Sequence, residues 1–274
     1  MTEVLRAKHD RLRETLEGME SVLVAYSGGV DSAYLACVAN SVRPGHVLCV
    51  TADSPSYPRH HRDLALRIAG EFHLEHEFVQ TAEMERPECR ANPANRCYHC
   101  KHELYTHLTA LARERAFAVI VDGSNADDRG DYRPGRQAAR EFGVRSPLDE
   151  ADLTKEEIRA LSRELGLPTA DEPASACLSS RIPYMSEVTE QKLRMIEGAE
   201  DALRRLGFRL CRVRHHDTLA RLEIDRAEMG RALEPEINAA ILRELKALGY
   251  KYVSLDLQGY RTGSLNEVLR LIPA

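Results

Sequence analysis

Long hydrophobic runs are absent from this 274-residue sequence, and so are internal repeats and low-complexity segments. No apolar stretch approaches the ~20 residues that span a bilayer, and the charged first 21 residues do not resemble a secretion signal. A positive charge balance is also absent, because the formal net charge is −5, which argues against a large nucleic-acid-binding surface. We therefore expect a cytoplasmic protein with a sizeable core that binds neither membranes nor nucleic acids.

Seven cysteines are present, an odd number that favours thiols, metal ligands or catalysts over a disulfide framework in a reducing compartment. Three lie in apolar segments and are expected to be small buried side chains: Cys37, Cys49 and Cys211. Cys97 and Cys100 have a spacing that places both sulfur atoms on one side of a helix. By itself, this pair fits a zinc half-site, a redox pair or two surface thiols.

Strand-like and helix-like segments alternate through the first 170 residues, which predicts a doubly wound parallel sheet of the α/β class. The apolar strand-like segments are residues 21–26, 46–52, 74–79 and 118–122. The helix-like segments between and around them are residues 1–18, 33–42, 58–70 and 100–115. Thr154 and Glu157 form a capping box that begins a further helix, which Gly166 ends.

The segment 167–184 contains three prolines and many small residues, so we expect a loop that separates two domains. Beyond it, the pattern predicts a small α+β domain from helix 189–206, strands 208–214 and 219–225, helix 234–248 and strand 250–257. His215 and His216 are expected in the hairpin turn. The predicted division is an α/β domain at 1–170, a linker with Cys177 at 171–186, and the α+β domain at 187–274.

A glycine turn, Ser27-Gly28-Gly29-Val30-Asp31-Ser32, follows the first predicted strand and precedes a helix. Glycines let the backbone approach a phosphate closely, and amide groups at a helix start point toward the anion. Ser27 and Ser32 add hydroxyl donors, and Asp31 is placed to hold Mg²⁺ against pyrophosphate oxygens. After the second strand, Asp53 either contacts the adenosine or starts a turn.

This turn resembles the PP-loop of ATP pyrophosphatases, whose domain is adenine nucleotide alpha hydrolase-like. It lacks the lysine of a Walker A sequence, so transfer of the γ-phosphate is not the expected chemistry. The resemblance implies that ATP is split between its α- and β-phosphates, with an adenylated intermediate.

Further motifs extend the resemblance over nearly the whole chain. They are Asn95–Lys101 (NRCYHCK), Asp122–Asp128 (DGSNADD), Asp131–Gly135 (DYRPG), Ala176–Tyr184 (ACLSSRIPY) and Arg212–Arg214 (RVR). Together they look like the LarE family of ATP-dependent pyridinium-3,5-biscarboxylic acid mononucleotide sulfurtransferases, which help to build the nickel-pincer nucleotide cofactor. The sequence departs from the family pattern at Ala170 and Met185, where Trp and Gly are expected.

The resemblance implies that a substrate carboxylate attacks the α-phosphate of ATP, and that sulfur then attacks the acyl-adenylate. Cys177 is the implied nucleophile, with Arg181 nearby to favour its thiolate. In the simplest family members, this cysteine gives up its own sulfur and becomes dehydroalanine. Other members have three active-site cysteines, which implies that Cys97, Cys100 and Cys177 bind a [4Fe–4S] cluster with one iron open to hydrosulfide. The implied cofactors are ATP, Mg²⁺ and this cluster.

Arg212 and Arg214 alternate onto one face of a predicted strand, and Glu223 lies on the next strand. Paired guanidinium groups suit the phosphate of the mononucleotide substrate. The alternative is a solvated sheet face with cross-strand salt bridges. Glu200 and Arg261 are weaker candidates for the same pocket.

Three other functions share parts of this pattern: a tRNA thiolase, an ammonia-using ligase similar to GMP or NAD synthetase, and an ATP-binding regulatory module. A tRNA thiolase would be expected to show a basic face or an added RNA-binding module, which this acidic chain lacks. The LarE resemblance also implies a homo-oligomer and possible nickel-pincer cofactor assembly proteins as partners.

Overall fold

The chain divides into two units with separate hydrophobic cores. Unit 1 comprises residues 1–83 and 95–175, and unit 2 comprises residues 84–94 and 176–274. The structure, a computed structural model, describes residues 2–130, 133–173 and 176–261. Asp131 and Tyr132 of the predicted DYRPG motif therefore lie outside the described residues. The domain boundaries expected at residues 170 and 187 stay a prediction.

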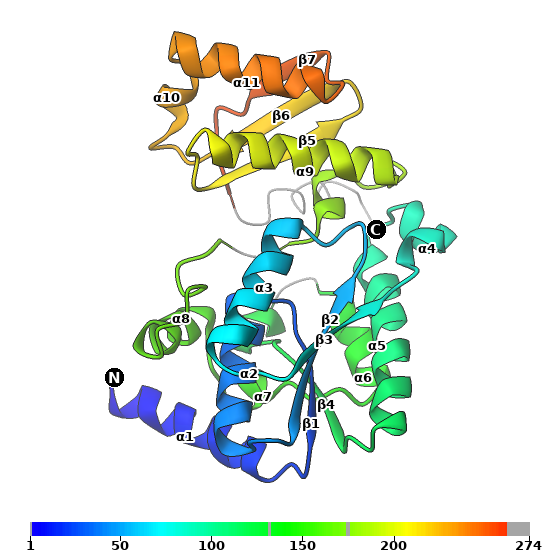
Figure 1. Ribbon diagram of the computed structural model, residues 1–274, viewed down its shortest axis with the longest axis vertical. Coiled ribbons are helices and arrows are strands. Elements are labelled where there is room, and N and C mark those ends of the chain that lie inside the picture. The colour runs from blue at the N-terminus through cyan, green and yellow to red at the C-terminus, as the bar shows by residue number, and fades with distance from the viewer. Residues whose placement is uncertain (1, 131–132, 174–175, 262–274) are drawn as a thin grey trace. The chain divides into compact units, whose positions relative to one another are not determined.

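A four-stranded sheet forms the centre of unit 1, and all its neighbouring strands are parallel (Figure 1). In spatial order the strands are β3 (His76–Gln80), β2 (Val47–Asp53), β1 (Val22–Ala25) and β4 (Val119–Asp122). All residues of β1 are buried, as expected for a parallel sheet covered on both faces. The strand order reverses beside β1, and sheets of this kind bind ligands at the carboxyl ends of the strands near such a point.

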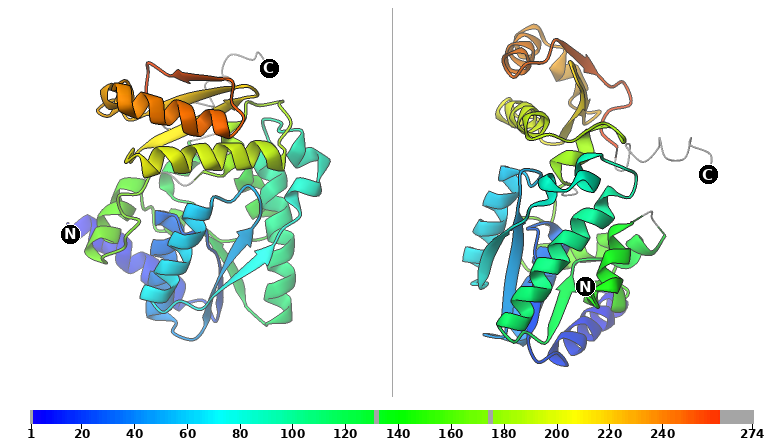
Figure 2. Two further views of the ribbon diagram at one scale, coloured as in Figure 1. Left: turned by 45° about the horizontal axis from the view of Figure 1, so that its top comes forward. Right: turned by 90° about the vertical axis from the view of Figure 1, so that its right-hand side faces the viewer.

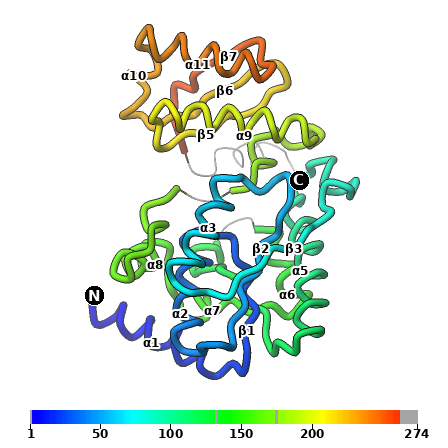
Figure 3. Tube along the Cα trace, viewed as in Figure 1, coloured from blue at the N-terminus to red at the C-terminus, as the bar shows by residue number. Residues whose placement is uncertain are grey.

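Two helical layers cover this sheet. One face packs against α1 (Glu3–Glu17), α2 (Val30–Val42), α3 (Arg59–Glu71), α7 (Pro147–Glu150) and α8 (Lys155–Glu164). The other packs against α5 (Arg96–Glu114) and α6 (Gly135–Glu141). Val22 and Val24 of β1 join the first core, whereas Leu23 and Ala25 join the second. The predicted doubly wound α/β architecture is confirmed, and Figure 3 follows the chain from β1 through α2 into β2.

The predicted capping box of α8 is also confirmed. The Thr154 hydroxyl accepts a hydrogen bond from the Glu157 backbone amide at 3.3 Å, and the Glu157 carboxylate accepts one from the Thr154 amide at 2.9 Å. Short 3₁₀ turns occur at η1 (Glu83–Glu85) and η2 (Ala126–Arg129). Within the described ranges, no helix has both the length and the apolar character needed to cross a membrane.

Unit 2 is built on a three-stranded sheet in the order β5 (Cys211–His216), β6 (Leu219–Ile224) and β7 (Tyr252–Leu255). The first pair is antiparallel and the second is parallel. Its helices are α4 (Pro87–Arg90), the 3₁₀ turn η3 (Leu178–Arg181), α9 (Glu190–Arg205), α10 (Met229–Ala232) and α11 (Pro235–Ala247). Figure 2 shows α9 and α11 side by side on one face of this sheet. The predicted α+β order is confirmed, with α10 as an additional short helix.

The expectation that His215 and His216 form the hairpin turn is wrong. Both belong to β5, and the turn consists of Asp217 and Thr218. His215 lies on the same alternating face as the buried Val213, so its ring packs into the core instead of turning into solvent.

Candidate functional site

The glycine turn of unit 1 connects the carboxyl end of β1 to the first turn of α2. Gly28 has a φ of +66°, and a Cβ there would lie 2.8 Å from the Cβ of Ala65 on α3, so a side chain cannot be accommodated. The Ser32 hydroxyl accepts a hydrogen bond from the Ser27 backbone amide and donates to the Gly29 carbonyl, both at 3.1 Å. These bonds fix the loop around the start of the helix, where a phosphate would bind.

Asp31 lies in the first turn of α2 and is half-buried. One carboxylate oxygen is paired with the ammonium of Lys155, and the other accepts a 3.4 Å bond from the Asn125 amide. Burial raises the pKa of Asp31, and attraction to Lys155 opposes this increase. The residue predicted to bind magnesium therefore has one carboxylate oxygen paired with Lys155, a residue that was not predicted from the sequence.

The loop after β4 packs directly on the glycine turn. A Cβ on Gly123 would lie 2.9 Å from the Ser32 backbone nitrogen and 3.2 Å from the Asp31 Cβ, so this contact requires glycine. Asp122, the last residue of β4, is buried and accepts a 2.9 Å bond from the Tyr105 hydroxyl. Glycine at position 123 of the DGSNADD motif is thus explained by the close approach of this loop to the PP-loop.

Asp53 is the last residue of β2. Its carboxylate accepts bonds from Arg62 at 3.2 Å and from Gln80 at 3.1 Å. The turn that follows begins at Ser54, whose carbonyl accepts from the Tyr57 amide at 3.0 Å. A contact between Asp53 and adenosine stays a prediction.

Four of the seven cysteines are buried, and burial was expected from the sequence for three of them, Cys37, Cys49 and Cys211. The four buried thiols are Cys37, Cys49, Cys89 and Cys211, and burial raises the pKa of Cys37 and of Cys211 to about 12. Cys97 is exposed and Cys100 is half-buried, both near the start of α5 in unit 1. Half-buried Cys177 precedes η3 in unit 2. Among the described residues, no group of three or more His, Cys, Asp and Glu side chains forms a metal site.

The turn that carries Cys177 is held by a buried arginine. The Arg181 guanidinium donates to the carbonyl of Ala176 at 2.8 Å and to the carbonyl of Cys177 at 3.0 Å. Its other nitrogens donate to the two oxygens of Glu200 on α9, at 2.8 and 3.1 Å. Burial alone would raise the pKa of Glu200, but attraction to Arg181 and its hydrogen bonds lower it to about 2.

Arg212 and Arg214 on β5 are also buried, with exposed fractions of 8% and 7%. Arg214 donates to Glu223 on β6 at 2.8 Å and to the Ser180 carbonyl at 2.7 Å. The Arg212 guanidinium lies 5.4 Å from the ring centre of Tyr260. The alternative of a solvated sheet face is therefore wrong, although a cross-strand ion pair is present.

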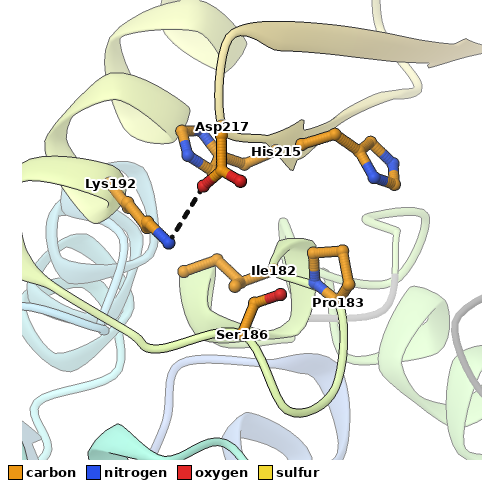
Figure 4. A pocket seen from close by; sticks show the side chains of 7 residues that line it. Ile182, Pro183, Ser186, Lys192, His215 and Asp217 are labelled. Atoms are coloured by element: carbon orange, nitrogen blue, oxygen red, sulfur yellow. Dashed lines mark ion pairs between the residues drawn. The ribbon is translucent and has the colours of Figure 1, made fainter.

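A cavity of about 120 Å³ lies within unit 2 beside the loop that follows Cys177 (Figure 4). Its lining includes Ile182, Pro183, Ser186, Lys192, His215 and Asp217. The Lys192 ammonium pairs with Asp217 at 3.2 Å, as the dashed line shows. Burial lowers the pKa of His215 to about 4, so this ring is neutral near pH 7. The half-buried Arg261 is not part of this lining.

The structure thus gathers the predicted residues into two groups. In unit 1 they surround the glycine turn: Ser27, Gly28, Gly29, Asp31 and Ser32, with Lys155 added. In unit 2 they surround the Cys177 turn: Arg181, Glu200, Arg212, Arg214 and Glu223. Lys155 was not predicted because it is 124 residues from Asp31 and the only local sequence signal around it is the capping box of Thr154 and Glu157.

Known proteins resemble this chain over nearly its full length. The family model described as asparagine synthase matches residues 9–236. An uncharacterized protein of Synechocystis is 43% identical over 97% of this chain and 99% of its own length. The pyridinium-3,5-bisthiocarboxylic acid mononucleotide synthase of Lactiplantibacillus plantarum is 35% identical, over 97% and 96% of the two chains. An uncharacterized protein of Methanocaldococcus jannaschii is 28% identical, over 89% and 92%.

Proposed function

Because this chain belongs to the asparagine synthase family of PP-loop proteins and, within it, to the LarE family, we propose that it converts pyridinium-3,5-biscarboxylic acid mononucleotide to a thiocarboxylate. The chain is an ATP-dependent sulfurtransferase of nickel-pincer cofactor biosynthesis. One observation carries the proposal: a PP-loop with Asp31 at a helix start occurs in the same chain as Cys177 on a turn held by Arg181.

The PP-loop performs the first half of the reaction. A substrate carboxylate oxygen attacks the α-phosphorus of ATP, and pyrophosphate leaves with the electron pair of the broken bond. The amides at the start of α2 and the hydroxyl of Ser27 hold the phosphate oxygens, whereas the hydroxyl of Ser32 shapes the loop by donating to the Gly29 carbonyl. The ion pair with Asp31 holds the ammonium of Lys155 beside the same loop. This positive charge stabilises the negative charge of the leaving group.

Asp31 suits a magnesium ligand because it offers carboxylate oxygens beside the phosphate loop. When bound there, Mg²⁺ supplies charge neutralisation for pyrophosphate. The ammonium of Lys155 contacts one oxygen of the same carboxylate, so it compensates the Asp31 charge before the metal binds.

Sulfur transfer forms the second half. A sulfur nucleophile attacks the acyl carbon, and AMP leaves with its phosphate oxygen. Cys97, Cys100 and Cys177 are proposed as cluster ligands because they are partly or fully exposed, whereas the other four thiols are buried. When bound by three thiolates, a [4Fe–4S] cluster supplies an iron without a protein ligand and therefore a place for external sulfide. The alternative source of sulfur is Cys177 itself.

The substrate phosphate is assigned to Arg212 and Arg214. Their guanidinium groups are buried, and Arg214 contacts the carbonyl of Ser180, three residues after Cys177. Buried guanidinium groups bind a dianionic phosphate more strongly than exposed ones, because water screens them less. The proposal also includes a cytoplasmic location, a homo-oligomer and assembly proteins that receive the product.

The deciding experiment uses anaerobically reconstituted full-length protein with ATP, sulfide and the pyridinium mononucleotide. We expect near four irons per chain, more than one product per chain, and an unchanged Cys177 mass. Cys97→Ala, Cys100→Ala and Cys177→Ala should each lose most of the iron, whereas the matched control Cys89→Ala should retain it. An iron-free protein whose Cys177 loses the mass of hydrogen sulfide after one turnover would establish sacrificial transfer instead.

A second measurement addresses ATP. Asp31→Ala should abolish pyrophosphate release while the far-UV circular dichroism spectrum is unchanged, and Asp10→Ala on α1 serves as a control. Normal pyrophosphate release by folded Asp31→Ala would contradict the assignment of the PP-loop. A product formed with ammonia and without sulfide would identify a ligase.

A further inference from the structure

Asn92 occupies an unusual position just before the Cys97-x-x-Cys100 helix. It lies between α4 and α5 and is completely buried. Its φ is +53°, in the left-handed region that asparagine tolerates better than most residues. The short segment 84–94 around it belongs to unit 2, although the chain on either side belongs to unit 1.

The side chain and backbone of Asn92 both bond to the loop that leaves Cys177. Its amide nitrogen donates to the carbonyls of Ile182 at 3.2 Å and Pro183 at 2.8 Å. Its own carbonyl accepts from the backbone amide of Met185 at 2.9 Å. Because both N–H groups of the amide have carbonyl partners, only a side chain with two donors reproduces this arrangement.

Neighbouring contacts extend the same connection. The Val188 amide donates to the Arg90 carbonyl at 2.8 Å, and the Arg90 guanidinium pairs with the exposed carboxylate of Glu187. The segment 84–94 and the loop 182–188 are therefore joined by main-chain bonds, a buried amide and a surface ion pair. The Asn92 side chain is fully buried, whereas the Arg90–Glu187 pair is about half exposed, so water screens the ion pair much more than the amide.

The two segments joined by these bonds lie close in sequence to the three cysteines. Cys97 is five positions after Asn92, and Ile182 is five positions after Cys177. A five-residue segment spans at most about 18 Å. The covalent chain therefore keeps each cysteine segment within reach of the same hydrogen bonds.

We infer that Asn92 is a positioning residue: it holds the segment that leads into the Cys97-x-x-Cys100 helix to the loop that follows Cys177, and the covalent chain then limits how far the three thiols can separate. This inference rests on the proposed function, in which the three cysteines act together. It assigns no contact between Asn92 and substrate or sulfur. Asn92 acts through the loop whose carbonyls it binds.

The test compares Asn92→Ala and Asn92→Asp with the control Glu187→Ala, which removes the exposed ion pair between the same two segments. Aspartate keeps the size of asparagine and tolerates the left-handed backbone, but its carboxylate cannot donate to the carbonyls. Two quantities are measured: pyrophosphate released, and thiolated product formed per pyrophosphate. For both Asn92 variants we expect pyrophosphate release within about twofold of the parent protein and at least a tenfold lower product yield per pyrophosphate. Glu187→Ala should match the parent in both.

A second readout does not depend on activity. A bismaleimide of about 15 Å span, which is shorter than one fully extended five-residue segment, should cross-link Cys177 to Cys97 or Cys100 in the folded, iron-free parent protein. Peptide mapping identifies the linked thiols. The yield should decrease at least fivefold in a folded Asn92 variant and be unchanged in Glu187→Ala.

The outcomes separate the two proposals. Cross-linking in the parent and in Asn92→Asp to the same extent overturns the role of Asn92, whatever the activity. A folded parent protein without this cross-link overturns it too, even if both variants fail to fold. If the cross-link behaves as expected but the parent forms no thiolated product, the proposed function fails and the positioning role of Asn92 stands.

Discussion

Replacing Glu200 by glutamine should strongly destabilise unit 2, because this substitution removes the charge that balances a buried guanidinium. Glu200 is fully buried, and its bonds to Arg181 measure 2.8 and 3.1 Å. Attraction to Arg181 outweighs the effect of burial and lowers the pKa of Glu200 from 4.5 to about 2. That difference corresponds to about 3 kcal/mol of stability, consistent with the roughly 3–5 kcal/mol lost when one partner of a buried pair is removed.

The pH dependence has a definite sign. Because the pKa of Glu200 is lowered on folding, its contribution is complete above pH 4.5 and is lost as the pH falls toward 2. The parent protein should therefore lose about 3 kcal/mol more than Glu200→Gln across this interval. Above pH 4.5 the difference between the two proteins should be constant.

Urea unfolding followed by far-UV circular dichroism measures both effects, and it suits a chain without tryptophan. Glu190→Gln is the matched control, since Glu190 also lies on α9 and pairs with an arginine, Arg194, at 3.0 Å. Both partners of that pair are more than half exposed, so its loss should cost about 0–1 kcal/mol. The reasoning is refuted if Glu200→Gln lowers the free energy of unfolding no more than Glu190→Gln does at pH 7. It is also refuted if Glu200→Gln, like Glu190→Gln, loses as much stability in acid as the parent protein.

Three further predictions follow from single contacts. Lys155→Ala should slow pyrophosphate release and shift its acidic limb to higher pH, because Lys155 opposes the raised pKa of Asp31; an unshifted pH profile would argue against this coupling. Met185→Gly should increase the free energy of unfolding by up to about 1 kcal/mol, since Met185 has a φ of +65° and is 77% exposed; a decreased melting temperature would contradict it. Arg212→Ala and Arg214→Ala should weaken mononucleotide binding by about 10- to 150-fold in isothermal titration and leave ATP affinity unchanged, and an equal loss of ATP affinity would count against the phosphate assignment.

The local chemistry of the sequence was enough to predict most secondary structure. Apolar segments with small flanking residues became β1, β2 and β4, because a parallel strand is buried on both faces and shows it in composition. The capping box at Thr154 and Glu157 marked the start of α8, since its hydrogen bonds join residues three positions apart. The family pattern led us to expect glycine at position 185. Met185 adopts the left-handed backbone there, which explains why glycine was expected.

The candidate site was only partly predictable for the same reason. The PP-loop is a continuous motif, so its residues could be named from the sequence and their arrangement follows from a strand, a turn and a helix. The burial of Arg212 and Arg214 could not be predicted, because alternation along a strand shows that two residues share a face but not what covers that face. His215 was misplaced because polarity suggested a turn, whereas the packing of β5 placed its ring in the core.

The sequence by itself therefore determined most of the order of strands and longer helices and the phosphate loop, both of which depend on residues close together in the chain. Tertiary structure decided which distant residues meet. Lys155 pairs with Asp31 across 124 residues, and Asn92 bonds to Ile182 across 90. Such contacts leave no periodic pattern, because each depends on one side chain and on the path of the whole chain between the partners.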